Sequence, residues 1–127
     1  MVRTAKARSA VIVGLRLDGK AIGVDPGWTV SVYADRDVVR GWEEIELTRH
    51  DDGFWSAHFV AANVELSIQP DGGLETRPAG TYGGYEQLDA LTFPDGVSIV
   101  YRINRESWSI GRYVGRYLGH PLVVEQR

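Results

Sequence analysis

The chain has 127 residues and contains no cysteine, and this absence excludes several kinds of site. Without cysteine there is no disulfide framework, no zinc or iron–sulfur centre held by thiolates, and no thiol nucleophile. The length is that of a single domain, which buries enough apolar surface to fold without a cross-link or a structural metal. We therefore expect one domain spanning residues 1–127.

Long hydrophobic runs are also missing. The apolar run at residues 10–15 ends at Arg16, and it is shorter than the ~7–15 residues of a secretory signal. No stretch approaches the ~20 apolar residues of a membrane-spanning helix. We expect no signal peptide and no membrane span, and a location in the cytoplasm of the producing cell or in a particle that leaves it by lysis.

Patterns that support catalysis are scarce. The three histidines, His50, His58 and His120, do not stand at the spacing of metal ligands, so we expect each to be a surface or strand histidine. There is no Gly-x-Ser-x-Gly elbow and no glycine-rich loop opening a helix. Glu43 and Glu44 are neighbours in an expected strand and face opposite ways, so they cannot flank one glycosidic bond. We expect no enzyme activity, no cofactor and no bound metal.

Neither sign of charge dominates the whole chain, but each dominates part of it. The chain carries 14 basic and 17 acidic residues, a net charge of −3, which does not indicate a nucleic-acid partner. Residues 1–20 carry net +4, residues 21–96 net −10, and residues 97–127 net +3. The basic ends can pair with the acidic middle, within one molecule or between neighbouring copies. The alternative is solvated charge distributed by chance.

Residues that favour strands and turns are plentiful. The chain has fifteen glycines, five prolines, four tryptophans and six tyrosines, and no stretch of about twelve residues shows the apolar stripe of a helix. Strands spaced ~8–12 residues apart are typical of an all-β sandwich or barrel. The periodicity predicts strands at residues 10–17, 21–24, 29–34, 43–48, 54–60, 64–68, 74–77, 87–93 and 97–103.

An internal repeat narrows the fold. The run Gly-Trp-Glu at residues 41–43 recurs as Gly-Tyr-Glu at residues 84–86, and the Asp-Gly turns that follow recur at the same spacing, 43 residues. A period of ~40 with four strands per unit indicates propeller blades or trefoil units. A propeller needs at least four blades, whereas units of about 10–53, 54–96 and 97–127 make three. The repeat therefore favours a trefoil.

The same residues carry a family resemblance. An Asp35-Arg36 pair, a short spacer and the run from Gly41 to Leu47 resemble the fascin-like β-trefoil repeat, and Arg77 with the run from Gly84 to Leu88 repeats the pattern. The resemblance covers residues 11–96. Only 31 residues follow Gly96, and they contain no Gly-aromatic-Glu element. We expect an all-β, β-trefoil-like barrel of three pseudo-repeats whose third unit is truncated or irregular.

The aromatic residues divide into an expected core and an expected interface. The resemblance implies that the repeat aromatics pack in the barrel, so the core residues are Trp42, Ile45, Leu47, Tyr85 and Leu88. Trp28 lies in a turn, where it either contacts a sugar or partner or folds over the barrel mouth. The C-terminal segment combines basic and aromatic side chains, which is typical of protein interfaces: Trp108, Arg112, Tyr113, Arg116 and Tyr117. Its alternative is a last strand pair packed on its own barrel.

Function follows from the resemblance more than from any single residue. Fascin-like trefoils serve as binding units for saccharides and protein filaments, and similar repeats occur in phage structural proteins. We expect a non-catalytic structural or attachment module, a small component of a phage virion, such as the tail, baseplate or capsid decoration. Its partners would be other structural proteins or copies of itself. The alternative is a free lectin-like module that binds a cell-surface saccharide; filament crosslinking, which uses several trefoils per chain, fits less well.

Overall fold

The computed structural model describes most of the first hundred residues and the C-terminal strand. The described residues are 9–26, 30–51, 54–69, 73–88, 90–92, 94, 98–100 and 122–127. They form strands, turns and short 3-10 helices, and none of them lies in an α-helix. The expected all-β class is confirmed.

The described strands join in one ten-stranded sheet. In chain order they are β1 (Ser9–Leu17), β2 (Lys20–Asp25), β3 (Ser31–Arg36), β4 (Ile45–Arg49), β5 (Trp55–Phe59), β6 (Val64–Ile68), β7 (Leu74–Pro78), β8 (Ala90–Thr92), β9 (Ser98–Val100) and β10 (Leu122–Gln126). Each of the first nine overlaps a strand predicted from the sequence, whereas β10 was not predicted.

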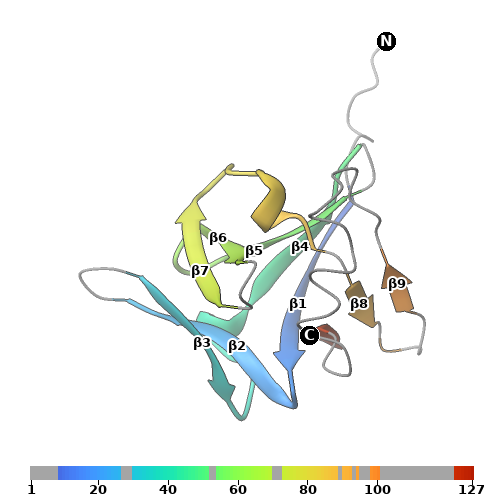
Figure 1. The fold of residues 1–127 in the computed structure, drawn as a ribbon. Coiled ribbons are helices and arrows are strands. Elements are labelled where there is room, and N and C mark those ends of the chain that lie inside the picture. Colours follow the sequence, from blue (N-terminus) through green and yellow to red (C-terminus); the bar gives the residue numbers. More distant parts are fainter. Residues whose placement is uncertain are drawn as a thin grey trace.

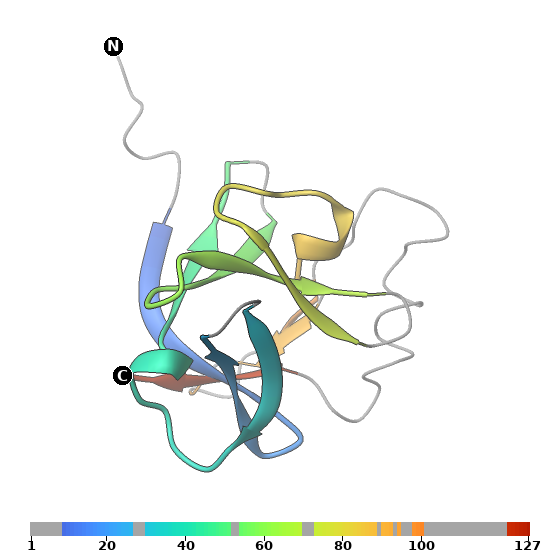
Figure 2. The ribbon, with the colours of Figure 1, turned by 90° about the vertical axis from the view of Figure 1, so that its left-hand side faces the viewer.

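The sheet curls into a nearly closed barrel (Figures 1 and 2). β1 pairs antiparallel with β4 and with β10, and β4 pairs antiparallel with β5. β10 pairs in parallel with β8, and an isolated bridge from Trp55 to Leu88 joins β5 to the residues just before β8. The expectation of a barrel is therefore confirmed, and its closure uses the last strand in an unusual parallel pair.

Two hairpins lie on the same side of this barrel. They are β2–β3 and β6–β7, which sit on the left in Figure 1 and face the viewer in Figure 2. The Asp18-Gly19 turn that leads into β2 has positive φ at both residues (56° and 84°), the conformation that a tight two-residue turn requires. The hairpins touch where the Thr76 hydroxyl donates to the Val30 carbonyl oxygen at 3.3 Å.

The core fills the barrel from the inward side of each strand. Alternation on β1 sends Val13 and Leu15 inward, and β4 does the same with Ile45 and Leu47. Phe59 on β5 is the largest side chain with no exposure. Burying side chains of this size stabilises a fold by ~1.5–3 kcal/mol each, so this cluster holds the strands in register. Other members of the cluster are Ile22, Val24, Val32, Ala57, Leu66, Ile68, Leu88, Leu91, Leu122 and Val124.

The Gly-aromatic-Glu runs both fold as a single 3-10 turn, η2 (Gly41–Glu43) and η3 (Gly84–Glu86). In each turn the glutamate is buried, and one of its oxygens accepts the backbone N–H three residues earlier. Glu43 Oε1 accepts from Arg40 at 2.7 Å, and Glu86 Oε1 accepts from Gly83 at 2.8 Å. The repeated sequence thus encodes a repeated structure, a self-capped turn before β4 and again before β8.

The second oxygen of each glutamate meets a different partner. Glu43 Oε2 accepts from Arg36 Nε at 3.1 Å, whereas Glu86 Oε2 accepts from the buried Ser67 hydroxyl at 2.6 Å. Burial lowers the pKa of Arg36, but hydrogen bonds to Glu43 and Asp35 and the charge of Asp25 outweigh it, so the pKa of Arg36 is raised. The first turn is therefore part of a charged network, and the second rests on a neutral donor.

The repeat predicts that Trp42 is a core residue, and this prediction is wrong. Trp42 is 41% exposed, because the turn directs Glu43 inward to its capping bond and leaves the preceding ring outside. Tyr85, at the equivalent position, is half-buried and packs against the core. Ile45, Leu47 and Leu88 are buried in the core as expected.

Candidate functional site

A row of polar side chains crosses the outer face of the sheet at β4, β5 and β6. Glu46 on β4 is the register partner of His58 on β5, and His58 is the register partner of Glu65 on β6. Directly opposed residues on neighbouring strands share a face and lie close enough to interact. The sheet register therefore gathers two carboxylates and an imidazole in one line.

Strand alternation explains why this row faces outward. On β4 the flanking Ile45 and Leu47 point into the core, which leaves Glu46 on the opposite face. On β6 the same alternation opposes Glu65 to the inward Leu66. Glu65 is nevertheless buried, because the segment that follows β7 reaches back over it, with the Gly80 backbone N–H donating to Glu65 Oε2 at 3.0 Å.

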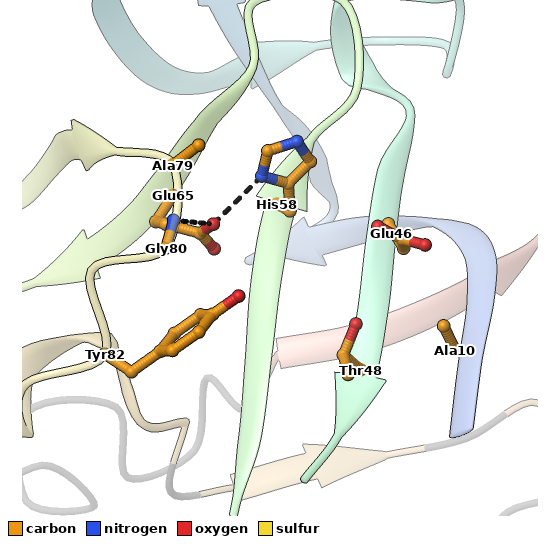
Figure 3. Close-up of a pocket in the computed structure, with 8 residues that line it drawn as sticks. All are labelled: Ala10, Glu46, Thr48, His58, Glu65, Ala79, Gly80 and Tyr82. Carbon is orange, nitrogen blue, oxygen red and sulfur yellow. Dashed lines mark hydrogen bonds and ion pairs between the residues drawn. The ribbon is translucent and has the colours of Figure 1, made fainter. Parts of the chain in front are cut away.

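A cavity of about 350 Å³ opens beside this row (Figure 3). Figure 3 shows Glu46 and Thr48 on β4, His58 on β5 and Glu65 on β6, with Tyr82 on the same side as Glu65 and across from Glu46 and Thr48. The other described lining residues are Ala10, Ala79 and Gly80. This volume lies at the lower end of the ~300–1,000 Å³ typical of small-ligand pockets.

His58 and Glu65 form a closely held pair inside the cavity. His58 Nδ1 lies 3.0 Å from Glu65 Oε2, and the Glu65 side chain is 1% exposed. A carboxylate oxygen accepts hydrogen bonds, so Nδ1 is the donor when it pairs with the Glu65 carboxylate. Glu65 Oε1 is buried as well and has no hydrogen-bond partner among the described residues.

A second histidine supports the wall of the cavity. His50 is buried, its Nε2 lies 2.8 Å from the Ser56 hydroxyl oxygen, and its ring stacks on Phe54 with centroids 4.1 Å apart. Tyr82 meets the same imidazole edge-on at 4.6 Å. These contacts hold the Tyr82 ring against the protein and so fix one side of the cavity.

The lining favours the binding of a ligand that donates hydrogen bonds. No group of three His, Cys, Asp or Glu side chains that could hold a metal ion occurs in the described part of the chain. Among the described lining residues are two carboxylates and a histidine, and no lysine or arginine. Such a site favours a ligand rich in donors or carrying positive charge.

The interface residues expected from the sequence are not among those that the structure describes. Trp28, Trp108, Arg112, Tyr113, Arg116 and Tyr117 all fall outside the described residues, so their role as an interface stays a prediction. The cavity was missed because sequence patterns treat His58 as an isolated histidine and Glu65 as an ordinary outward strand residue. The only available signal was the cross-strand alignment of Glu46, His58 and Glu65, which requires knowledge of the register.

Comparison with known proteins adds no relative. No family model matches the chain, and no match was found among curated proteins or solved structures. No helix in the described ranges is long and apolar enough to cross a membrane. Arguments about function therefore rest on the chain's own residues.

Proposed function

We propose that this protein is a non-catalytic structural or attachment module, built on a β-trefoil-like barrel, that assembles through contacts with other proteins or with copies of itself. A role in a phage virion rests on the resemblance of the repeat to fascin-like trefoils. Three features of the described residues support the proposal: the repeated units, the irregular closure of the barrel, and the open strand edge beside that closure.

The repeated units support the trefoil part of the proposal. Strand, hairpin, self-capped 3-10 turn and strand occur in this order from β1 to β4 and again from β5 to β8. The two turns stand 43 residues apart and have the same hydrogen bonds. The third unit begins with β9 and ends with β10, and this is the part of the barrel that the sequence expects to be irregular.

The observation that carries the assembly part is the edge of β9. β9 ends the path of the sheet, and within the described residues it pairs with β8 alone. An unpaired edge offers backbone donors and acceptors to a strand of another chain. The basic-aromatic segment that contains Arg112 and Arg116 follows β9 in the sequence, so edge and segment would act together on an acidic neighbour.

Sedimentation velocity tests this proposal. We expect the wild-type protein to self-associate, and more weakly at high salt because screening shortens the reach of exposed charges. Arg112→Glu with Arg116→Glu should prevent association. The matched control, Arg40→Glu with Arg49→Glu, makes the same change of charge at two exposed arginines of the barrel and should leave association intact.

Two results would contradict assembly through this segment. One is a wild-type protein that stays monomeric at every salt concentration and with every structural protein of its source. The other is a charge-reversed variant that associates like the wild type while circular dichroism shows an intact fold.

Saccharide binding is the second candidate, and the cavity at Glu46, His58 and Glu65 favours it. Carboxylates that accept hydrogen bonds beside an aromatic ring such as Tyr82 suit sugar hydroxyls and the apolar face of a sugar. A glycan array on the monomeric charge-reversed variant distinguishes the two candidates. Saturable binding that is weakened by Glu46→Gln would support saccharide binding. An array without any signal would support assembly as the function.

A further inference from the structure

We infer that the cavity at β4, β5 and β6 is a binding site for a guanidinium group, such as an arginine side chain presented by another polypeptide. The inference concerns residues that the assembly proposal does not use, and it holds whether or not the protein self-associates. Four observations lead to it, and each concerns a side chain in or beside the cavity.

The first observation is the buried carboxylate oxygen of Glu65. Oε2 receives both His58 Nδ1 and the Gly80 N–H, whereas Oε1 has no partner within the described part of the chain. A buried polar atom without a partner carries a desolvation cost that a hydrogen bond from a ligand removes. In Figure 3 this second oxygen lies on the Tyr82 side of the carboxylate, toward the cavity.

The second observation is the sign of the charge. Glu46 and Glu65 both line the cavity, and the described lining residues include no lysine or arginine. The acidic side chains of the described lining therefore favour a cation over a neutral or anionic ligand.

The third observation concerns the arginine that the sheet register places beside Glu65. Arg77 on β7 is the register partner of Glu65, yet its guanidinium pairs with Glu75 at 2.8 Å and with the Thr76 carbonyl oxygen at 2.9 Å. Glu65 is thus left without the ion pair that its strand neighbour could supply. A second guanidinium, delivered from outside, would complete the same kind of pair.

The fourth observation is the shape of the donor set that the cavity requires. Carboxylate acceptors stand on two strands, at Glu46 and at Glu65 Oε1, so a ligand must direct donors toward more than one side. A guanidinium presents five N–H donors in one plane, whereas an ammonium is a compact point charge. The plane can also stack on an aromatic face, which Tyr82 offers at the cavity wall.

The test is a titration with a pair of small ligands that differ in charge. Nuclear magnetic resonance would follow the ring signals of His58, assigned with a His58→Gln variant, during addition of N-acetyl-arginine methylamide or the citrulline equivalent. Citrulline keeps the length and planarity of arginine but is neutral. We expect saturable shifts with the arginine derivative and binding at least tenfold weaker for the citrulline derivative.

Variants locate the effect in the cavity. Glu65→Gln should weaken binding of the arginine derivative at least tenfold, and Glu46→Gln should weaken it several-fold. The control Asp37→Asn removes an exposed carboxylate that lies outside the cavity lining and pairs with Lys20, and it should change nothing. If Glu65→Gln does not fold, the half-exposed Glu46 provides the same comparison without disturbing a buried group.

Three results would overturn the inference: no saturable shift of His58 signals, equal binding of the two derivatives, or equal binding to the wild type and to Glu46→Gln. A lysine derivative that binds as tightly as the arginine derivative would overturn the assignment to guanidinium.

Adding the arginine derivative to the self-associated protein tests where the guanidinium group in the cavity comes from. Dissociation by the arginine derivative but not by citrulline would place an arginine of a neighbouring copy in the cavity. Binding that leaves association unchanged would assign the cavity to a different protein. Failure of self-association alone would leave the titration, and with it this inference, intact.

Discussion

At η2 and at η3 the chain makes the same 3-10 turn, and in both the buried glutamate accepts the backbone N–H three residues before it. The surroundings differ. Glu43 faces Arg36, which also pairs with Asp25 and Asp35, whereas Glu86 faces the hydroxyl of Ser67. Local sequence therefore determines the turn, and the strand behind it determines how the carboxylate charge is compensated.

The residue behind each turn explains the choice of partner. In the first unit this residue is Gly23, and an added Cβ there would lie 2.7 Å from Glu43 Oε2 and 3.0 Å from Arg36 Nε. In the second unit the position 44 residues later is Ser67, which hydrogen-bonds Glu86 itself. The small residue makes room for an arginine, and the hydroxyl makes the arginine unnecessary.

The largest expected losses of stability come from replacing each of the two buried glutamates separately. Glu86→Ala should cost about 3 kcal/mol of unfolding free energy, because it removes a cap and leaves the buried Ser67 hydroxyl without its acceptor. Glu43→Ala should cost about 2 kcal/mol, since Arg36 keeps Asp25 and Asp35 as partners. Chemical denaturation measures both, with Glu75→Ala as an exposed control that stays within about 0.5 kcal/mol of the wild type. Equal losses at both turns would show that the compensating partner does not matter.

A smaller effect is expected from filling the space at Gly23. Gly23→Ala should destabilise the protein by about 2 kcal/mol, because the new methyl group would overlap the Glu43 carboxylate. Combining it with Glu43→Ala should cost less than the two single changes together, since the truncated side chain no longer meets the methyl group. A double-mutant cycle by denaturation measures this coupling. Additive losses would mean that Gly23 acts through something other than space for Glu43.

Effects of similar or smaller size are expected at the two repeat aromatics. Tyr85→Ala should cost about 2 kcal/mol, because its ring packs against the core. Trp42→Ala should cost about 1 kcal/mol despite the larger side chain, because the ring is substantially exposed. Thermal denaturation followed by circular dichroism compares the two variants. A Trp42 variant that is less stable than the Tyr85 variant would restore the symmetric core that the repeat suggests.

Much of the fold is predictable from the sequence because strands are encoded locally. Alternation of apolar and polar residues locates β1 to β9, and turn residues such as Asp18-Gly19 separate them. β10 was not predicted, because its place in the sheet depends on β1 and β8, which are remote in sequence. The exposure of Trp42 was not predicted either, because a repeat fixes equivalent backbone but not equivalent packing.

The candidate site is harder to predict, for a related reason. Alternation correctly places Glu46 and Glu65 on the faces opposite Ile45 and Leu66. Alternation does not reveal that the residues around Gly80 return across β6 and bury Glu65. A period-two pattern separates the two faces of a strand, but which face meets water depends on segments that pack later.

The pairing of β1 with β10 also constrains how the protein is made. Arg16 and Glu125, which form an ion pair across these strands, stand 109 positions apart. During synthesis β1 leaves the ribosome early and one of its edges has no partner until β10 follows. Contacts of such long separation slow folding, and an open strand edge on a nascent chain invites pairing with its neighbours. We therefore expect the yield of folded protein to depend on chaperones and expression temperature more strongly than the stability of the finished barrel would suggest.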